Sequence, residues 1–290
     1  MESVVGTGGE GGYMNFQQKL DAIIEKNNSL LCVGLDSNYD RIPEHLKSEE
    51  FPQFEFNKAI IDATHDLVCA YKPNSAFYEA RGEQGMRELK MTMDYLGETY
   101  PEIATIDDAK RGDIGSTNDG YVNSIFDYYG FDSVTLHPYL GKEALKPFLD
   151  RKDKGCIVLC RTSNPGAGEF QDLVVETRHG ASLPLYQCVA QEIYDHWNDH
   201  ENCLLVIGAT YPRELAEIRK LCPDMTFLVP GIGAQGGDVE KTVKAGLNSK
   251  NAGMIINSSR GVIFAGSGED FADVARKEAA RTRDEINMYR

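Results

Sequence analysis

Short apolar segments alternate along the chain with longer amphipathic segments. The apolar segments are near-continuous runs, which is typical of parallel strands buried on both faces. They predict eight strands, at 30–36, 67–73, 103–110, 133–138, 155–162, 203–210, 226–233 and 253–260. The amphipathic patterns between and around them predict helices, among them 15–27, 85–98, 142–151, 212–222, 239–247 and 269–289.

Eight strand–helix units in one direction predict a single-domain (β/α)8 TIM barrel. A doubly wound open sheet is the structural alternative, but it rarely carries eight units this evenly spaced. We expect the barrel domain to occupy residues 14–290, because Met14 opens the first helical pattern and no linker or repeat divides the rest. Residues 1–13 are rich in glycine and are predicted to be a disordered extension, either native or left by cloning.

Composition narrows the possible partners. The 290-residue chain carries a net charge of −15, so neither nucleic acid nor an anionic membrane is an expected partner. No segment approaches the apolar length of a membrane span. The seven cysteines show no CxxC spacing and most lie within apolar runs. They are therefore predicted to be buried free thiols of a cytoplasmic protein rather than a disulfide framework.

Charged residues follow the predicted strands at the point where each strand ends. Asp36, Lys72, Asp108, Lys110 and Arg260 all occupy such positions. A single charged residue there is typical of a solvated loop. In a TIM barrel, however, all of these ends meet at one mouth, where active sites lie. Their convergence therefore predicts a functional site with mutually shifted pKa values.

The segment IDDAKRGDIGSTN, residues 106–118, carries the sharpest pattern. Asp108 and Lys110 are two positions apart on a predicted strand, so both side chains are expected to face the barrel cavity. Asp113 follows where the chain turns toward the next helix, and Thr117 lies one helical turn farther on. Taken alone, DxKxxD could also be a strand end followed by a helix N-cap.

Two later segments are suited to binding phosphate. GIGAQGG at 231–237 and SSRG at 258–261 follow the seventh and eighth predicted strands, where TIM barrels commonly hold phosphate groups. Glycines let backbone N–H groups approach an anion, and Arg260 offers a planar fork of donors. A glycine-rich loop alone is usually a simple turn, but together with the arginine it favours a phosphate site.

Six motifs, in order along the chain, resemble the orotidine monophosphate decarboxylases. DAKRGDIGST is similar to the signature of that family, and CVGLDSN, YKPNSAFYE, LCRTSNPGAG, VPGIGAQGGD and INSSRGV follow its pattern from about Met14 to the C-terminus. The TSNPGA and PGIGAQGGD versions resemble its longer subgroup. The resemblance implies that orotidine 5'-monophosphate is decarboxylated to UMP in de novo pyrimidine biosynthesis. It also implies that no cofactor is needed and that active sites are shared within a homodimer.

The resemblance also implies a role for individual residues. The catalytic set is Lys72, Asp108, Lys110 and Asp113, with Asp113 reaching into the site of the neighbouring subunit. The expected substrate contacts are Asp36 and Asp113 on ribose hydroxyls, Thr117 supporting the composite site, Ser163 and Gln235 on the pyrimidine, and Gln235, Ser259 and Arg260 on the phosphate. No metal ligands are expected.

The chemistry fits this set of charges. Loss of CO2 from C6 of the pyrimidine leaves a carbanion that Lys110 can stabilise and then protonate, while Asp108 would lie near the departing carboxylate. The long connection at 163–180 is expected to be a lid, since Ser163 begins it.

Three other functions share part of this pattern. A Mg²⁺-dependent sugar-phosphate decarboxylase or synthase of the same superfamily shares DxKxxD, but Lys72 stands where that enzyme would need a carboxylate. A Schiff-base aldolase is disfavoured because flanking carboxylates keep the lysines protonated. A catalytically inactive binding barrel is disfavoured by the intact charge set.

Overall fold

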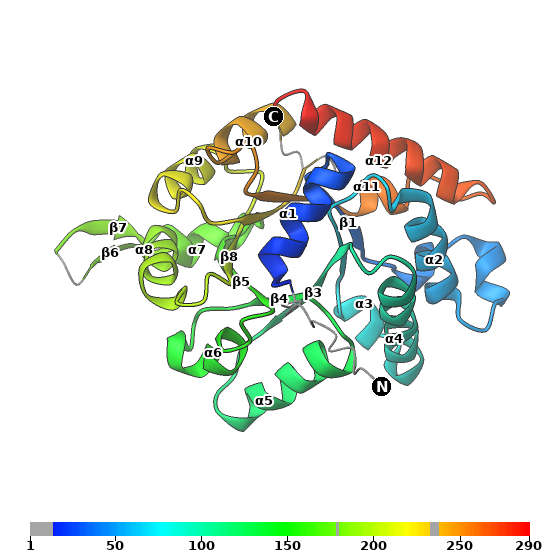
Figure 1. Ribbon diagram of the computed structural model, residues 1–290, viewed down its shortest axis with the longest axis horizontal. Coiled ribbons are helices and arrows are strands. Elements are labelled where there is room, and N and C mark those ends of the chain that lie inside the picture. Colours follow the sequence, from blue (N-terminus) through cyan, green and yellow to red (C-terminus); the bar gives the residue numbers. More distant parts are fainter. Residues whose placement is uncertain (1–13, 178–179, 233–237) are drawn as a thin grey trace, which may run out of the picture.

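The barrel predicted from the sequence is present in the computed structural model, which describes residues 14–177, 180–232 and 238–290. Within these residues, eight parallel strands close into a barrel in the order β1-β10-β9-β8-β5-β4-β3-β2 (Figure 1). The strands are β1 (Leu31–Leu35), β2 (Ala70–Pro73), β3 (Ala104–Arg111), β4 (Ser133–Leu136), β5 (Gly155–Arg161), β8 (Cys203–Ile207), β9 (Phe227–Pro230) and β10 (Met254–Ser258). Each lies within or one residue beyond its predicted range. The predicted extension at 1–13 lies outside the described residues.

Helices surround the barrel in the alternation that a TIM fold requires (Figure 1). The main helices are α1 (Phe16–Asn27), α2 (Pro52–Thr64), α4 (Gly82–Thr99), α5 (Ser116–Val122), α6 (Gly141–Leu149), α8 (Leu185–Glu192), α9 (Pro212–Leu221), α10 (Val239–Gly246) and α12 (Phe271–Asn287). Shorter turns are η1 (Tyr39–Arg41), η2 (Glu44–Ser48), α3 (Ala76–Glu79), η4 (Pro165–Ala167), α7 (Gly168–Gln171) and α11 (Arg260–Ile263), and α5 and α8 continue into the π-helical segments η3 (Asn123–Tyr128) and η5 (Ile193–Trp197).

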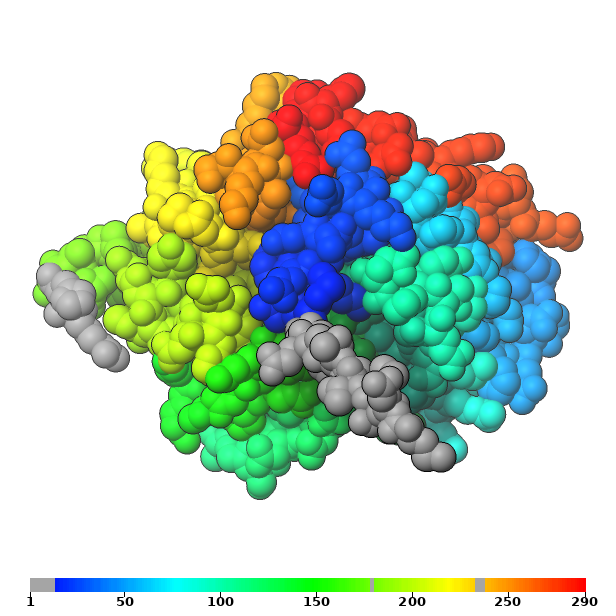
Figure 2. All heavy atoms as spheres, viewed as in Figure 1, coloured from blue at the N-terminus to red at the C-terminus, as the bar shows by residue number. Residues whose placement is uncertain are grey.

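Helix α1 closes the barrel at the amino ends of its strands. It crosses the centre of that face in Figure 1 and fills it in the space-filling view of Figure 2. Its first residue, Phe16, is buried and packs against Gly155, where an added Cβ would come within 2.6 Å of the ring. The amide of Phe16 donates to the carbonyl of Asp153 at 3.0 Å. With this end sealed, ligands must reach the barrel from the carboxyl ends of the strands.

The connection between β5 and α8 contains structure that the sequence pattern did not predict. After η4 and α7, the strands β6 (Val174–Glu176) and β7 (Ser182–Pro184) pair as an antiparallel hairpin. The hairpin projects from the side of the barrel in Figure 1, whereas α7 stays at the end of β5, where Gln171 bonds to Thr162. Only the α7 portion is therefore close enough to cover the mouth.

All seven cysteines are free thiols, and six of them are buried. Burial raises the pKa of the Cys32 thiol to about 12, which suppresses the reactive thiolate form. Among the described residues, no helix combines the length and the apolar character that crossing a membrane requires.

Candidate functional site

A cavity of about 550 Å³ opens at the carboxyl ends of the barrel strands. Leu159, Val206 and Leu228 give it an apolar wall. Its polar lining comes from several strand ends: Asp36, Lys72, Asn74, Asp108, Lys110, Thr162, Ser163, Asn164, Gln171, Asn257, Ser259 and Arg260. A cavity of this kind, apolar with convergent charged groups, is typical of a small-molecule site.

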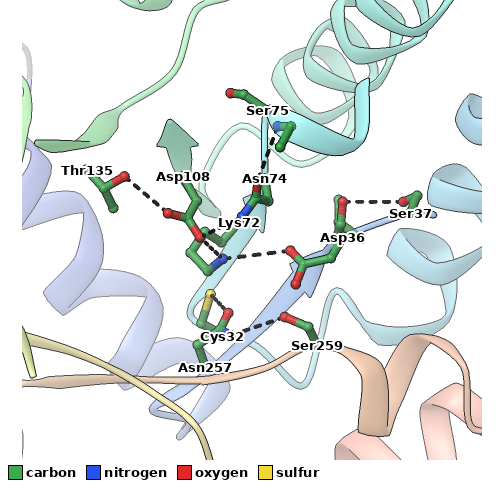
Figure 3. Close-up of polar contacts among 12 residues, drawn as sticks. Cys32, Asp36, Ser37, Lys72, Asn74, Ser75, Asp108, Thr135, Asn257 and Ser259 are labelled. Carbon is green, nitrogen blue, oxygen red and sulfur yellow. Dashed lines mark hydrogen bonds and ion pairs between the residues drawn. The ribbon is translucent and has the colours of Figure 1, made fainter. Parts of the chain in front are cut away.

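Two lysines hold one carboxylate at the centre of the cavity. The Nζ of Lys72 lies 2.8 Å from one oxygen of Asp108, and the Nζ of Lys110 lies 2.5 Å from the other. Lys72 also faces Asp36 at 3.8 Å, so it stands between two carboxylates, as Figure 3 shows. Strands β1, β2 and β3 are neighbours in the barrel, and this adjacency brings the four side chains together. The result is an alternating row of charges.

The protonation states of this row follow from its pairing. Burial opposes the charge of Lys72, but Asp108 and Asp36 outweigh that cost and raise the pKa of the ammonium above its usual range. Burial likewise opposes the charge of Asp108, but Lys72 and Lys110 outweigh it and hold the pKa of the carboxyl well below its usual range. At neutral pH both groups are charged. The site is therefore a preorganised electrostatic environment.

Lys110 sits in an irregular stretch of β3. Its φ is +49°, a conformation that side-chain-bearing residues rarely adopt. The pairing register of β3 with β4 shifts between Asp107 and Arg111 at this point, and the Lys110 amide donates to Thr135 Oγ1 at 2.9 Å rather than to a strand carbonyl. The distortion aims Lys110 at Asp108 while leaving its side chain about half exposed, at 48%. Strain stored in this way is common where a reactive group must be presented to a cavity.

Asn74 and Thr135 also bond to Asp108, and the sequence pattern did not single either of them out. Asn74 donates to Asp108 at 3.2 Å, next to the bond from Lys72 (Figure 3). Its neighbour Ser75 is buried and donates to Asp107, which faces the opposite side of β3 from Asp108. The sequence does show two polar residues shortly after Lys72 and two consecutive acidic residues at 107–108. Neither segment, however, contains a pattern that predicts its contact with the other.

Asp107 gives the fold a testable pH dependence. Burial raises the pKa of this carboxyl from 3.8 to about 6, with the Ser75 hydrogen bond opposing the shift. A folded-state pKa above the unfolded one means that stability is lost as the pH rises from about 4 through 6. A shift of this size corresponds to about 3 kcal/mol.

We therefore expect Asp107→Asn, which keeps the acceptor for Ser75, to be more stable than wild type by up to about 3 kcal/mol at pH 7.5. The two proteins should converge near pH 4. Urea unfolding of both proteins across pH 4–8 measures the difference between their free energies of unfolding. The contributions of the other titrating groups are common to both proteins and cancel in this difference. Parallel stability curves would show that Asp107 titrates normally.

The other predicted contacts in the cavity come from Asp36 of the charge row and from the ends of β10 and β5. The Oδ1 of Asp36 is buried and accepts no hydrogen bond from any described residue, so it is available to a ligand hydroxyl. Ser259 and Arg260 follow β10, the neighbour of β1 in the barrel, and begin α11; Arg260 makes no ion pair with the described part of the chain. Gly34 lets Ser259 approach, because an added Cβ would lie 1.9 Å from its hydroxyl oxygen. Ser163 also lines the cavity.

Two predicted site residues are not in this cavity, and a third lies outside the described residues. Asp113 and Thr117 do not line it; Asp113 instead caps its own turn by accepting from the Ile114 amide at 2.7 Å, and Thr117 is exposed on α5. Gln235 lies outside the described residues. The single chain thus brings together seven of the ten predicted residues: Asp36, Lys72, Asp108, Lys110, Ser163, Ser259 and Arg260.

Comparison with known proteins agrees with this geometry. Residues 29–273 match the family described as "Orotidine 5'-phosphate decarboxylase / HUMPS family". A Cellvibrio japonicus orotidine 5'-phosphate decarboxylase is 51% identical over 96% of this chain and 100% of its own length. A Janthinobacterium protein of the same name is 47% identical over 95% and 99%. The solved structure of Leishmania donovani OMP decarboxylase superposes with a TM-score of 0.80, 36% identity and coverage of 95% and 98%.

Proposed function

The chain belongs to the orotidine 5'-phosphate decarboxylase / HUMPS family, and from that premise we propose that it converts orotidine 5'-monophosphate to UMP and CO2 in pyrimidine biosynthesis. The observation that carries the proposal is the Lys72–Asp108–Lys110 row at the base of a cavity with Arg260 at its edge. The row supplies fixed charge for a carbanion, and the arginine supplies a partner for a phosphate.

The reaction needs an electrostatic site because the product of C–C cleavage is a localised carbanion. The bond between C6 and the carboxylate breaks, its electron pair stays on C6, and CO2 departs. Lys110, which is half exposed to the cavity and already charge-paired, places an ammonium beside that pair and then transfers a proton to C6. Solvent returns the proton to Lys110.

Asp108 and Lys72 set the field in which this happens. Asp108 stays ionised because its pKa is held low, so it repels the substrate carboxylate and favours its departure as neutral CO2. Lys72 is fully charged between Asp108 and Asp36 and holds Asp108 in place at 2.8 Å. Once CO2 has left, the two ammonium groups balance Asp108 and the carbanion. Stabilisation therefore grows as the reaction proceeds, which is the condition for catalysis.

The rest of the substrate fits the edges of the cavity. The Oδ1 of Asp36, which accepts no hydrogen bond from the described residues, can accept from a ribose hydroxyl, and Ser163 reaches the pyrimidine from the end of β5. The phosphate lies against Ser259 and Arg260 in this proposal; Gln235, predicted from the family resemblance to contact the phosphate and the base, is outside the described residues. A cavity of about 550 Å³ is of ordinary size for a nucleotide-sized ligand.

The active unit is proposed to be a homodimer with shared sites. Asp113 and Thr117 are outside their own cavity, and beside them Ile114 is 64% exposed. On the neighbouring β4 end, Tyr139 is 91% exposed. Large apolar side chains exposed at the rim of the mouth mark an interaction surface. A two-fold axis there would bring Asp113 and Thr117 to the partner's ribose. Seven free thiols are suited to a protein of the reducing cytoplasm.

The function is tested by incubating the protein with orotidine 5'-monophosphate after exhaustive dialysis against EDTA and following UMP or CO2. We expect full turnover, because Lys72 occupies the position where Mg²⁺ would need an oxygen ligand. If EDTA abolishes the activity and Mg²⁺ restores it, the assignment passes to the metal-dependent sugar-phosphate enzymes of the superfamily.

The phosphate contact gives a second prediction. Arg260→Ala should lower kcat/KM for orotidine 5'-monophosphate. The decrease should correspond to a loss of about 2–5 kcal/mol of transition-state stabilisation, the range for removing one member of a charge pair. The nucleoside orotidine has no phosphate, so its slower turnover should change little. Steady-state kinetics with both substrates make the comparison, and equal losses would place Arg260 away from the phosphate.

A further inference from the structure

Arg161, the last residue of β5, is a buried cation that the proposed reaction does not use. It is 2% exposed, and its guanidinium lies 4.0 Å from the ring centre of Tyr211 and 5.7 Å from that of Tyr186. Its Nε has no hydrogen-bond partner among the described residues. Burying a charge is costly unless its partners repay the cost. The partners of Arg161 are Gln171 and Asp172, both at the end of α7.

Arg161 fixes which way the Gln171 amide points. Its Nη1 donates to Gln171 Oε1 at 3.1 Å, and the Thr162 amide donates to the same oxygen at 2.9 Å. Arginine has only donors, so the oxygen of Gln171 must face it. The Gln171 nitrogen is then directed at Thr162 and donates to Oγ1 at 2.9 Å.

The orientation of the Gln171 amide in turn determines the orientation of the Asn164 amide. Because Thr162 Oγ1 accepts from Gln171, its proton is free to go to Asn164 Oδ1, 2.6 Å away. The Asn164 oxygen is thereby occupied, and the amide nitrogen is the group left to bond a ligand. Thr162, Asn164 and Gln171 all line the cavity of the functional site. A chain of oriented hydrogen bonds thus runs from a buried charge to the cavity surface.

Gln171 lies between the cavity of the functional site and a second cavity. The second cavity is mostly apolar and has a volume of about 650 Å³, and Leu159, Thr162 and Gln171 line both cavities. Besides Arg161, the Thr162 amide is the donor that holds the Gln171 oxygen in this wall. Without Arg161, the Gln171 oxygen keeps only one of its two donors, so the side chain is freer to swing outward or reverse, and Thr162 and Asn164 can reverse with it.

We propose that Arg161 is a positioning residue that acts through Gln171 and Thr162 to make Asn164 present amide protons, rather than a carbonyl oxygen, to the base of the nucleotide. The inference rests on the proposed function, because the C2 and C4 carbonyl oxygens of that base are acceptors that these amide protons can meet, while the donor N3–H lies between them. A pyrimidine with an amino group at C4 would place that N–H donor against the N–H donors of the Asn164 side chain. The relay is therefore a determinant of specificity for the 4-carbonyl base.

The test compares the dissociation constants of UMP and CMP, measured by calorimetry. Arg161→Met removes the charge that orients the relay. Gln171→Glu is near-isosteric but accepts at both oxygens, so the Thr162 proton turns toward residue 171 and releases the Asn164 amide. We expect each variant to lower the preference for UMP over CMP about tenfold, the effect of about one hydrogen bond. Arg161→Lys, which retains a charged donor, should restore most of it.

Arg213 provides the matched control, because it is exposed on α9 and pairs only with Glu217 among the described residues. Arg213→Met should keep the wild-type ratio, and thermal unfolding will show which variants are folded. If Arg161→Met is unfolded, Gln171→Glu decides the question. If the wild type decarboxylates its substrate but the folded variants keep the wild-type ratio of UMP and CMP dissociation constants, this inference alone is overturned. A wild type that binds neither nucleotide overturns the proposed function and the inference with it.

Discussion

Replacing Lys110 with alanine is expected to lower kcat by about 10⁴-fold or more, while UMP affinity changes by less than about tenfold. General acid catalysis contributes about 10²–10⁴, and loss of a fixed charge beside the carbanion adds a further factor of about 10²–10³. Binding should change little, since Arg260, Ser259 and Asp36 are untouched and lie at other edges of the cavity. The expected signature is therefore a loss in kcat rather than in binding.

Single-turnover kinetics and UMP titration of Lys110→Ala make this measurement. The fold should survive, because the Lys110 side chain is half exposed and alanine tolerates a φ of +49° about as well as lysine does. Lys244→Ala is a suitable control, since Lys244 is exposed on α10 and pairs with Glu240. Near-normal turnover in Lys110→Ala would remove this lysine from the mechanism.

Mixing two inactive proteins, Asp113→Ala and Lys110→Ala, is expected to restore about a quarter of wild-type activity. Each homodimer should be nearly inactive, because every site lacks either Asp113 or Lys110. In a mixed dimer with sites shared across a two-fold axis, one site carries both defects and the other carries neither. Random exchange of equal amounts makes about half of the dimers mixed, each with one good site, which gives the quarter.

The mixing experiment uses differently tagged chains, so that mixed dimers can be purified and assayed alone. Asp119→Ala is the matched control, since Asp119 is exposed on α5, the helix that follows Asp113. Its homodimer should be fully active, and mixing it with Lys110→Ala should give about half of wild-type activity whether or not sites are shared. Purified Asp113/Lys110 mixed dimers that stay inactive would place Asp113 in the site of its own chain.

The fold followed from the sequence because its signals are local. Each barrel strand is a short apolar run, and each run lies within a few residues of a charged or glycine-rich strand end. Parallel strands in a closed barrel put all those ends at one mouth. The same argument predicts where the cavity lies and that Lys72, Asp108 and Lys110 all face it. The family assignment rested on motifs at these same strand ends.

Other parts of the candidate site depend on contacts between segments far apart in the chain. Asn74 and Ser75 meet β3 through residues 34 and 32 positions away. The hairpin of β6 and β7 is short and none of its strand residues is buried, so it carries little of the periodicity that predicts strands. Residues Asp113 and Thr117 belong to the right motif, yet the turn after β3 takes them out of their own cavity.

The sequence by itself determined the barrel, its mouth and the residue types at that mouth, because hydrophobic periodicity and strand-end chemistry are properties of contiguous residues. Only the tertiary structure decided how those residues act on one another. It set the register shift that aims Lys110 at Asp108, the pairing that keeps Asp108 ionised, and the directed hydrogen bonds from Arg161 to Asn164. Distances and hydrogen-bond directions of this kind depend on how strands and loops are packed in space, and no pattern along a single segment encodes them.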